Sequence, residues 1–131
     1  MKVGVLKLLN LVNYFFKSFP DPIYHISIII KDSFFKMAKG YWLSTGSIKD
    51  GEGMQPYLKA LQGWLPSVNG KFFARDLATI EKESTLGHLT VIIEFPSKED
   101  AVSAYESEEY QKMIPLRTPY SDLTLTIFEG V

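Results

Sequence analysis

In the middle of the chain, the spacing of apolar residues changes from the two-residue period of a strand to the 3.6-residue period of a helix. Residues 40–48 predict a strand in which Tyr41 and Trp42 supply aromatic bulk. Turn residues follow at 50–53. Apolar side chains then recur at positions i, i+3, i+4, i+7 and i+11 of one helical face, namely Met54, Tyr57, Leu58, Leu61 and Leu65. The first unit is therefore a strand followed by a helix, which Pro66 ends.

Two further strands are predicted after a turn at Asn69 and Gly70. The first spans residues 71–76, and simple alternation places its side chains in two pairs on opposite faces, Phe72 with Ala74 and Phe73 with Arg75. Residues 77–83 are expected to continue it as a bent or bulged edge. Residues 88–95 give the clearest strand pattern, because three β-branched residues stand in series. Their near-continuous apolar run indicates burial on both faces.

The last third of the chain predicts two short helices and a closing strand. Ser97 can cap the first helix, with Asp100 at the reciprocal position. Ser107 is expected to cap the second helix, which Pro115 limits. Residues 120–129 then alternate as a strand. The resulting order β-α-β-β-α-β predicts an α+β, ferredoxin-like sandwich.

A ferredoxin-like sheet has helices on one face only. We expect the other face of this sheet to be apolar and to need a partner, most simply a second copy of the chain.

Residues 1–36 differ in composition from the rest of the chain. Phe, Ile, Lys, Asn and Tyr make up more than half of this segment and about a quarter of residues 37–131. Its net charge is 5 − 2 = +3, against 9 − 13 = −4 for the remainder. We therefore divide the chain into an N-terminal extension, residues 1–36, and a domain, residues 37–131. The extension is interpreted as a translated leader ahead of a native start at Met37, as an amphipathic surface helix or as a packed arm.

Composition excludes several functional classes. The chain has 131 residues and a formal net charge of −1, which excludes a strongly basic surface for nucleic acid. It has no cysteine, which excludes disulfides and thiolate metal sites. Two histidines are too few for a multi-histidine metal centre. Glycine-rich phosphate loops and nucleophile elbows are absent from the sequence. We expect no cofactor, no nucleic-acid partner, no membrane contact and a cytoplasmic location.

Several segments of residues 37–131 resemble the domain-of-unknown-function family 1330 (DUF1330). The matching segments are Met37 to Trp42, Gly70 to Arg75, Val91 to Ser97, the run from Ala104 to Gln111, Arg117 and the ending Phe128 to Val131. The resemblance implies a dimeric α/β barrel, in which two ferredoxin-like sheets pack face to face. Related families in that superfamily include cofactor-free monooxygenases, lactone isomerases, haem enzymes and ligand-sensing domains.

Two departures from the family pattern bear on function. The chain has Asp76 and Leu77 after Arg75, where the family tends to have two glycines, so a glycine-dependent backbone approach to a ligand is in doubt. It also has Glu108 where proline is usual, and either residue suits a helix start.

Two charged residues in predicted strands are candidates for chemistry. Arg75 can hold an anionic group of a substrate, and Glu94 can act as a base if both line a pocket. Alternatively, Arg75 and Glu94 pair with each other or face solvent at a strand end. His88, at the start of a strand, is a second candidate base and otherwise an exposed residue.

The other candidates are interpreted as ligand-binding residues. Tyr105 and Tyr110 can donate hydrogen bonds to a substrate oxygen or serve as core residues. Arg117 can bind an anion or simply complement a helix C-terminus. Trp42 can line a ligand cavity or pack in the core.

The sequence therefore predicts a homodimer with a cavity for a small organic ligand. The alternative is a cofactor-independent isomerase or monooxygenase acting on a small carbonyl or aromatic substrate. Whether the protein is an enzyme is left open by the sequence.

Overall fold

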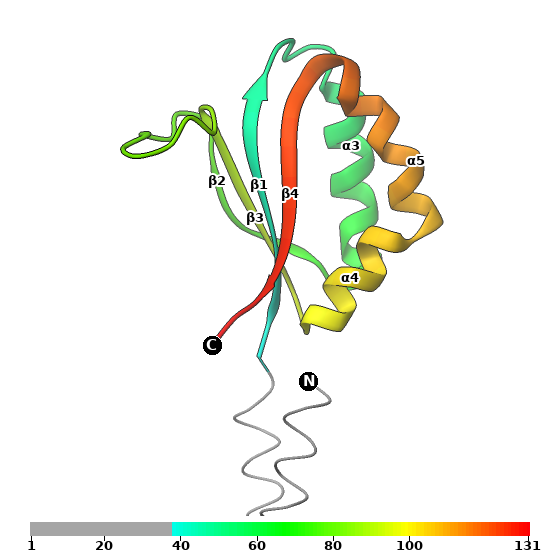
Figure 1. The fold of residues 1–131 in the computed structure, drawn as a ribbon. Coiled ribbons are helices and arrows are strands. Elements are labelled where there is room, and N and C mark those ends of the chain that lie inside the picture. The colour runs from blue at the N-terminus through cyan, green and yellow to red at the C-terminus, as the bar shows by residue number, and fades with distance from the viewer. Residues whose placement is uncertain (1–37) are drawn as a thin grey trace, which may run out of the picture. The chain divides into compact units, whose positions relative to one another are not determined.

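The computed structural model describes residues 38–131 of the chain, so the predictions for residues 1–36 and for a start at Met37 lie outside the described residues. The described part contains four strands and three α-helices (Figure 1), with bounds β1 (Gly40–Ile48), α3 (Gln55–Trp64), β2 (Lys71–Asp76), β3 (Leu89–Phe95), α4 (Lys98–Glu106), α5 (Glu108–Arg117) and β4 (Ser121–Glu129). Two short 3-10 turns, Leu65–Val68 and Thr118–Tyr120, follow α3 and α5.

The four strands form one antiparallel sheet in the order β2-β3-β1-β4. The three helices lie together on one side of this sheet (Figure 1). This order and layering confirm the predicted α+β, ferredoxin-like class. The two inner strands, β1 and β3, carry the side chains on which the core is built.

The core of the domain is centred on Trp42, which is 1% exposed. Trp42 pairs in register with Ile93 on β3 and Ile127 on β4, so these three side chains form a layer across the helix-facing side of the sheet. Its indole Nε1 donates to the carbonyl of Ala101 on α4 at 2.8 Å. This bond satisfies the polar atom of a large buried side chain and fixes α4 over β1.

The two serine caps predicted from the sequence are present. The Asp100 amide donates to Ser97 Oγ at 3.0 Å, and the Tyr110 amide donates to Ser107 Oγ at 3.2 Å. The turn before β2 also forms as expected, because Asn69 has a positive φ of 56°.

A β-bulge changes the faces of β2 from those predicted. Phe72 pairs with Ile93 but Ala74 pairs with Ile92, so the register shifts by one residue between them. Arg75 then pairs with Val91 and joins Phe72 on the helix-facing side, instead of joining Phe73. The predicted alternation was wrong here because a bulge inserts one unpaired residue, and a strict two-residue period contains no signal for it.

Residues 77–83 do not continue β2, contrary to the prediction. Asp76 Oδ1 accepts a hydrogen bond from the Ala78 amide at 2.8 Å, which replaces the next rung of the ladder with a local turn. The segment between β2 and β3 then projects from the sheet as a loop (Figure 1). β3 begins at Leu89 rather than at His88.

Pro115 does not limit α5, which continues to Arg117. The last turn is held by other contacts, because Arg117 is buried and its carbonyl accepts the Ser121 hydroxyl at 2.7 Å. The missing amide hydrogen of Pro115 therefore removes one helical bond without ending the helix.

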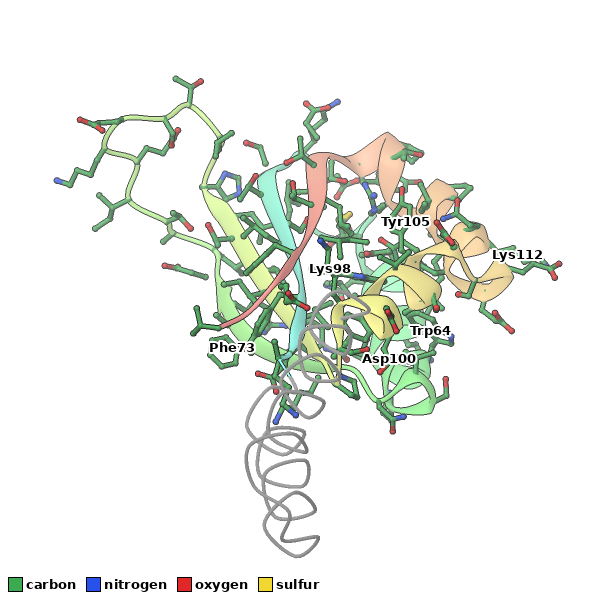
Figure 2. The ribbon with its side chains drawn as sticks, turned by 60° about the horizontal axis from the view of Figure 1, so that its bottom comes forward. Trp64, Phe73, Lys98, Asp100, Tyr105 and Lys112 are labelled. Carbon is green, nitrogen blue, oxygen red and sulfur yellow. The ribbon has the colours of Figure 1, made fainter. Side chains whose placement is uncertain are left out.

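The helix-free face of the sheet is less uniformly apolar than predicted. Thr45, Thr124 and Thr126 lie on it, and the Thr45 and Thr124 hydroxyls are 3.0 Å apart. Its apolar residues are Leu43 and Ile92, which pair in register, and an aromatic cluster in which Tyr41 stacks on Phe128 at 5.2 Å and meets the edge of Phe73 at 5.7 Å. Phe73 lies on the sheet away from Tyr105 and Trp64, which belong to the helical layer (Figure 2).

Two glycines offer a matched test of packing in this fold. A Cβ at Gly40 would lie 2.5 Å from Lys98 Cα and closer still to the Ser97 carbonyl group, whereas a Cβ at Gly63 in α3 meets nothing within 4 Å. We expect Gly40→Ala to destabilise the domain by about 1–3 kcal/mol through overpacking. Gly63→Ala should stabilise it by about 0.5–1 kcal/mol, because alanine is the better helix former. Urea unfolding of both variants measures this, and equal effects of one sign would contradict the described packing of α4 on β1.

Candidate functional site

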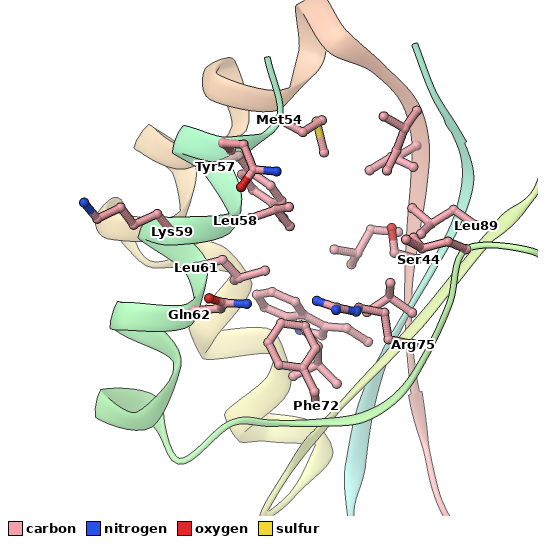
Figure 3. Close-up of a pocket in the computed structure, with 18 of the residues that line it drawn as sticks. Ser44, Met54, Tyr57, Leu58, Lys59, Leu61, Gln62, Phe72, Arg75 and Leu89 are labelled. Atoms are coloured by element: carbon pink, nitrogen blue, oxygen red, sulfur yellow. The ribbon is translucent and has the colours of Figure 1, made fainter. Parts of the chain in front are cut away.

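A cavity of about 630 Å³ lies between α3 and the helix-facing side of the sheet (Figure 3). Its walls come from α3 and from all four strands, and they are mostly apolar, including Leu58, Leu61, Val91, Ile93 and Leu125. This volume lies within the usual range for small-molecule sites.

The cavity exists because α3 is held by the neighbouring helix more than by the sheet. α4 packs on β1, β3 and β4, whereas the main helical partner of α3 is α5. Apolar side chains of α3 and of the strands that face this space consequently remain only partly buried. They include Leu58, Val91, Leu123 and Leu125. A helix pressed fully onto the sheet would have closed this space.

Arg75 is placed at the cavity by the bulge in β2. Its side chain extends from β2 toward α3, and Gln62 extends from α3 toward it (Figure 3). Within residues 38–131, no hydrogen bond or salt bridge occupies the guanidinium group. The predicted pairing of Arg75 with Glu94 does not form, because the two residues lie on opposite faces of the sheet.

A buried polar cluster lies where α3 meets α5. The hydroxyls of Tyr57 and Tyr110 are 3.2 Å apart, and the Arg117 guanidinium lies 5.8 Å from the centre of the Tyr57 ring. Burial raises the pKa of Tyr57, and the nearby Tyr110 raises it further, while Arg117 acts in the opposite direction. Tyr57 lines the cavity, and its neutral hydroxyl is held by Tyr110 inside the helical layer.

Of the other predicted binding residues, Trp42 on β1 lines the cavity. Three belong to the helical layer and do not line it, namely Tyr105, Tyr110 and Arg117. Tyr110 is completely buried against Trp42, with the ring centres 4.7 Å apart, and Tyr105 meets the edge of Trp42 at 6.1 Å. Tyr110 and Arg117 therefore support the cavity wall through Tyr57, and Tyr105 packs against the core.

Glu94 lies on the helix-free face of the sheet. Its side chain is only 11% exposed, and it accepts a hydrogen bond from the Tyr41 hydroxyl at 3.1 Å. Lys71 Nζ lies 3.3 Å from the other carboxylate oxygen, across the β2–β3 register. Partial burial and the adjacent Glu94 carboxylate raise the pKa of Tyr41.

His88 lies apart from both groups. It is exposed just before β3, and its carbonyl accepts the Thr79 amide at 2.9 Å. The structure thus does not bring the two predicted bases, Glu94 and His88, into the cavity with Arg75.

Sequence reasoning missed several polar residues that line the cavity, among them Tyr57 and Gln62. Tyr57 was counted only as part of the apolar stripe of the first helix, although a hydroxyl on that stripe must find a buried partner. Gln62 follows Leu61 on the edge of the same stripe, and no sequence pattern distinguishes it from a solvent-facing glutamine.

No cluster of three or more metal-ligating side chains occurs among residues 38–131. In the same part of the chain, every helix is too short or too polar to cross a membrane.

A family model described as a domain of unknown function, DUF1330, matches residues 39–131. The chain belongs to this family. The comparison with curated proteins gave no match for this DUF1330 chain.

Solved structures share the fold of this DUF1330 domain at low sequence identity. A protein of unknown function from Rhodopseudomonas palustris, RPA0582, has a TM-score of 0.58 and 12% identity, over 78% of this chain and 92% of that one. A dimeric ferredoxin-like protein of unknown function from Jannaschia sp. CCS1 has a TM-score of 0.52 and 13% identity, over 70% and 98% of the two chains. Another dimeric ferredoxin-like protein of unknown function, from Thermobifida fusca, has a TM-score of 0.50 and 13% identity, over 72% and 92%. These likenesses show the ferredoxin-like fold.

The buried tyrosine pair predicts how stability depends on alkaline pH. The pKa of Tyr57 is higher in the folded state than its ordinary value of 10.0, so its stabilising effect is complete below that value and is lost as the pH rises above it. We expect the free energy of unfolding to fall above pH 10 by up to about 1.4 kcal/mol per pH unit from this group. Urea unfolding at pH 8 to 11 should give a shallower decline for Tyr57→Phe than for the wild type. Some decline should persist in the variant, because the pKa of Tyr41 is raised as well. Identical slopes in the two proteins would contradict the buried state of Tyr57.

Proposed function

We propose that this DUF1330 chain is a homodimeric domain that binds a small organic molecule between α3 and the sheet. The cavity of about 630 Å³ carries this proposal, since it combines mostly apolar walls with a few polar groups at its margin. Apolar walls give affinity by removing the ligand from water, and isolated polar groups orient it.

The aromatic cluster on the helix-free face supports self-association. Phe73 is 61% exposed and Phe128 is 37% exposed, both beside Tyr41 on a face that the described helices leave uncovered. Adjacent exposed aromatic side chains are typical of protein interfaces. Proteins of the same fold from Jannaschia and Thermobifida fusca are described as dimeric. A second copy packed on this face gives the dimeric α/β barrel expected from the sequence.

The geometry favours binding over the alternative of a cofactor-independent isomerase or monooxygenase. General base catalysis requires a base within hydrogen-bonding reach of the substrate. Asp, Glu and His are absent from the described residues that line the cavity, and both candidate bases lie elsewhere. The cytoplasmic location stays a prediction from the sequence.

Filling the cavity should weaken binding while leaving the fold intact. Val91 lines the cavity and is partly buried, so Val91→Phe adds a ring to the cavity space. We expect the affinity for decanol, a neutral apolar probe, to fall at least tenfold in this variant. Trp42 lines the same space, so its fluorescence reports the titration.

Leu116→Phe is the matched control, because Leu116 is 39% exposed on α5 and is not among the residues that line the cavity. It should bind decanol as the wild type does. Wild-type protein that binds no decanol, or equal affinities for Val91→Phe and wild type, would refute a binding site in this cavity.

The self-association surface has a test of its own. Phe128→Asp places a charge in the aromatic cluster, which a dimer through this face would bury at high free-energy cost. Size-exclusion chromatography with light scattering should find a dimer for the wild type and a monomer for this variant. Leu116→Asp is the control, since Leu116 has similar exposure, 39% against 37%, but lies on α5. A monomeric wild type, or a dimeric Phe128→Asp variant, would disprove this interface.

A further inference from the structure

We propose that the ligand of the cavity carries a carboxylate, which Arg75 binds, on an otherwise apolar body. This inference rests on the proposed function and names the chemical class of the ligand. It depends on three properties of the described residues, namely the direction of Arg75, the charges around the cavity and the composition of its walls.

The direction of Arg75 leaves its guanidinium available to a ligand. The bulge in β2 turns the side chain to the helix-facing side, where it extends across the cavity margin toward Gln62 (Figure 3). Its sequence neighbour Asp76 lies on the opposite face, paired with Thr90, and Asp76 Oδ1 is occupied by the Ala78 amide. Within residues 38–131, Arg75 has no carboxylate partner.

The charges at the cavity favour an anion. Arg75 and Lys59 are the charged residues among those that line it, and acidic residues are absent from the described lining. Lys59, however, extends from α3 away from the cavity (Figure 3). Arg75 is thus the cation directed at the space, while Lys59 adds positive charge at the rim.

The pairing of a guanidinium with an apolar cavity limits the chemistry of the ligand. The planar guanidinium presents two parallel N–H donors that match the two oxygens of a carboxylate. The remaining walls are largely aliphatic and aromatic, including Leu58, Phe72 and Val91, and they offer an alkyl or aryl body a dry environment. The Gln62 amide, facing Arg75, can add a hydrogen bond to the same group.

Matched probes separate this inference from the proposed function itself. Decanoate and decanol share the same chain and differ in the head group, so calorimetric titration of both tests the cavity and Arg75 independently. We expect Arg75→Gln to lower the affinity for decanoate by about tenfold, a modest factor for a charged hydrogen bond because Arg75 is exposed at the rim. The affinity for decanol should change by less than about twofold. Arg75→Lys should retain part of the preference for decanoate, since it keeps the charge but loses the paired donors.

Lys59→Gln is the matched control, because it removes a charge of the same sign at the same rim from a side chain directed away. A specific carboxylate site predicts that this variant loses affinity for decanoate by less than about twofold, the small effect of a screened charge at the rim, against about tenfold for Arg75→Gln. Equal losses in Arg75→Gln and Lys59→Gln would show general electrostatic attraction and overturn the role of Arg75. Unchanged decanoate binding in Arg75→Gln, with decanol still bound, would overturn the carboxylate inference alone. Failure of the wild type to bind either probe would overturn the proposed function as well.

Discussion

The contact between α3 and α5 is the constraint on which the cavity depends. The Tyr57 and Tyr110 hydroxyls meet at 3.2 Å inside the helical layer, and the Arg117 guanidinium lies over the Tyr57 ring. Buried polar groups must be satisfied, so Tyr57 cannot move toward the sheet without losing its partner. α3 is thereby anchored to α5 and stands off from the strands. The space beneath it follows from a polar contact in an otherwise apolar layer, rather than from a shortage of apolar side chains.

The second determinant of the site is a single unpaired residue in β2. Without the bulge between Phe72 and Ala74, Arg75 would lie on the same face as Glu94 and away from the cavity. With it, Glu94 is partnered by Tyr41 and Lys71 on one face, and Arg75 is directed into the cavity on the other. One register shift thus separates the two charges and gives the cavity its positive group.

These two features also explain how far sequence reasoning reached. The hydrophobic period and the capping residues were enough to predict the fold. Ser97 and Ser107 cap helices through contacts three residues away, and the final strand follows a simple alternation of side chains. Local sequence patterns reflect short-range contacts of this kind. The site was predicted only in part, since Arg75 and Trp42 do line the cavity but Glu94 and His88 do not. The bulge and the pairing of Tyr57 with Tyr110, 53 residues apart, are set by tertiary packing, which a period does not encode.

The open cavity has a thermodynamic consequence for a domain of this size. Small domains bury a limited fraction of their apolar surface, and apolar side chains left partly exposed lower the free energy of unfolding further. Here Val91, Leu123 and Leu125 are only partly buried because α3 stands off from the sheet. Burial of Tyr41, Phe73 and Phe128 against a second copy would recover apolar contact on the opposite face of the same strands. The proposed function has two parts, ligand binding and self-association. Both therefore have the same physical effect, since each covers apolar surface that one copy of the fold leaves incompletely packed.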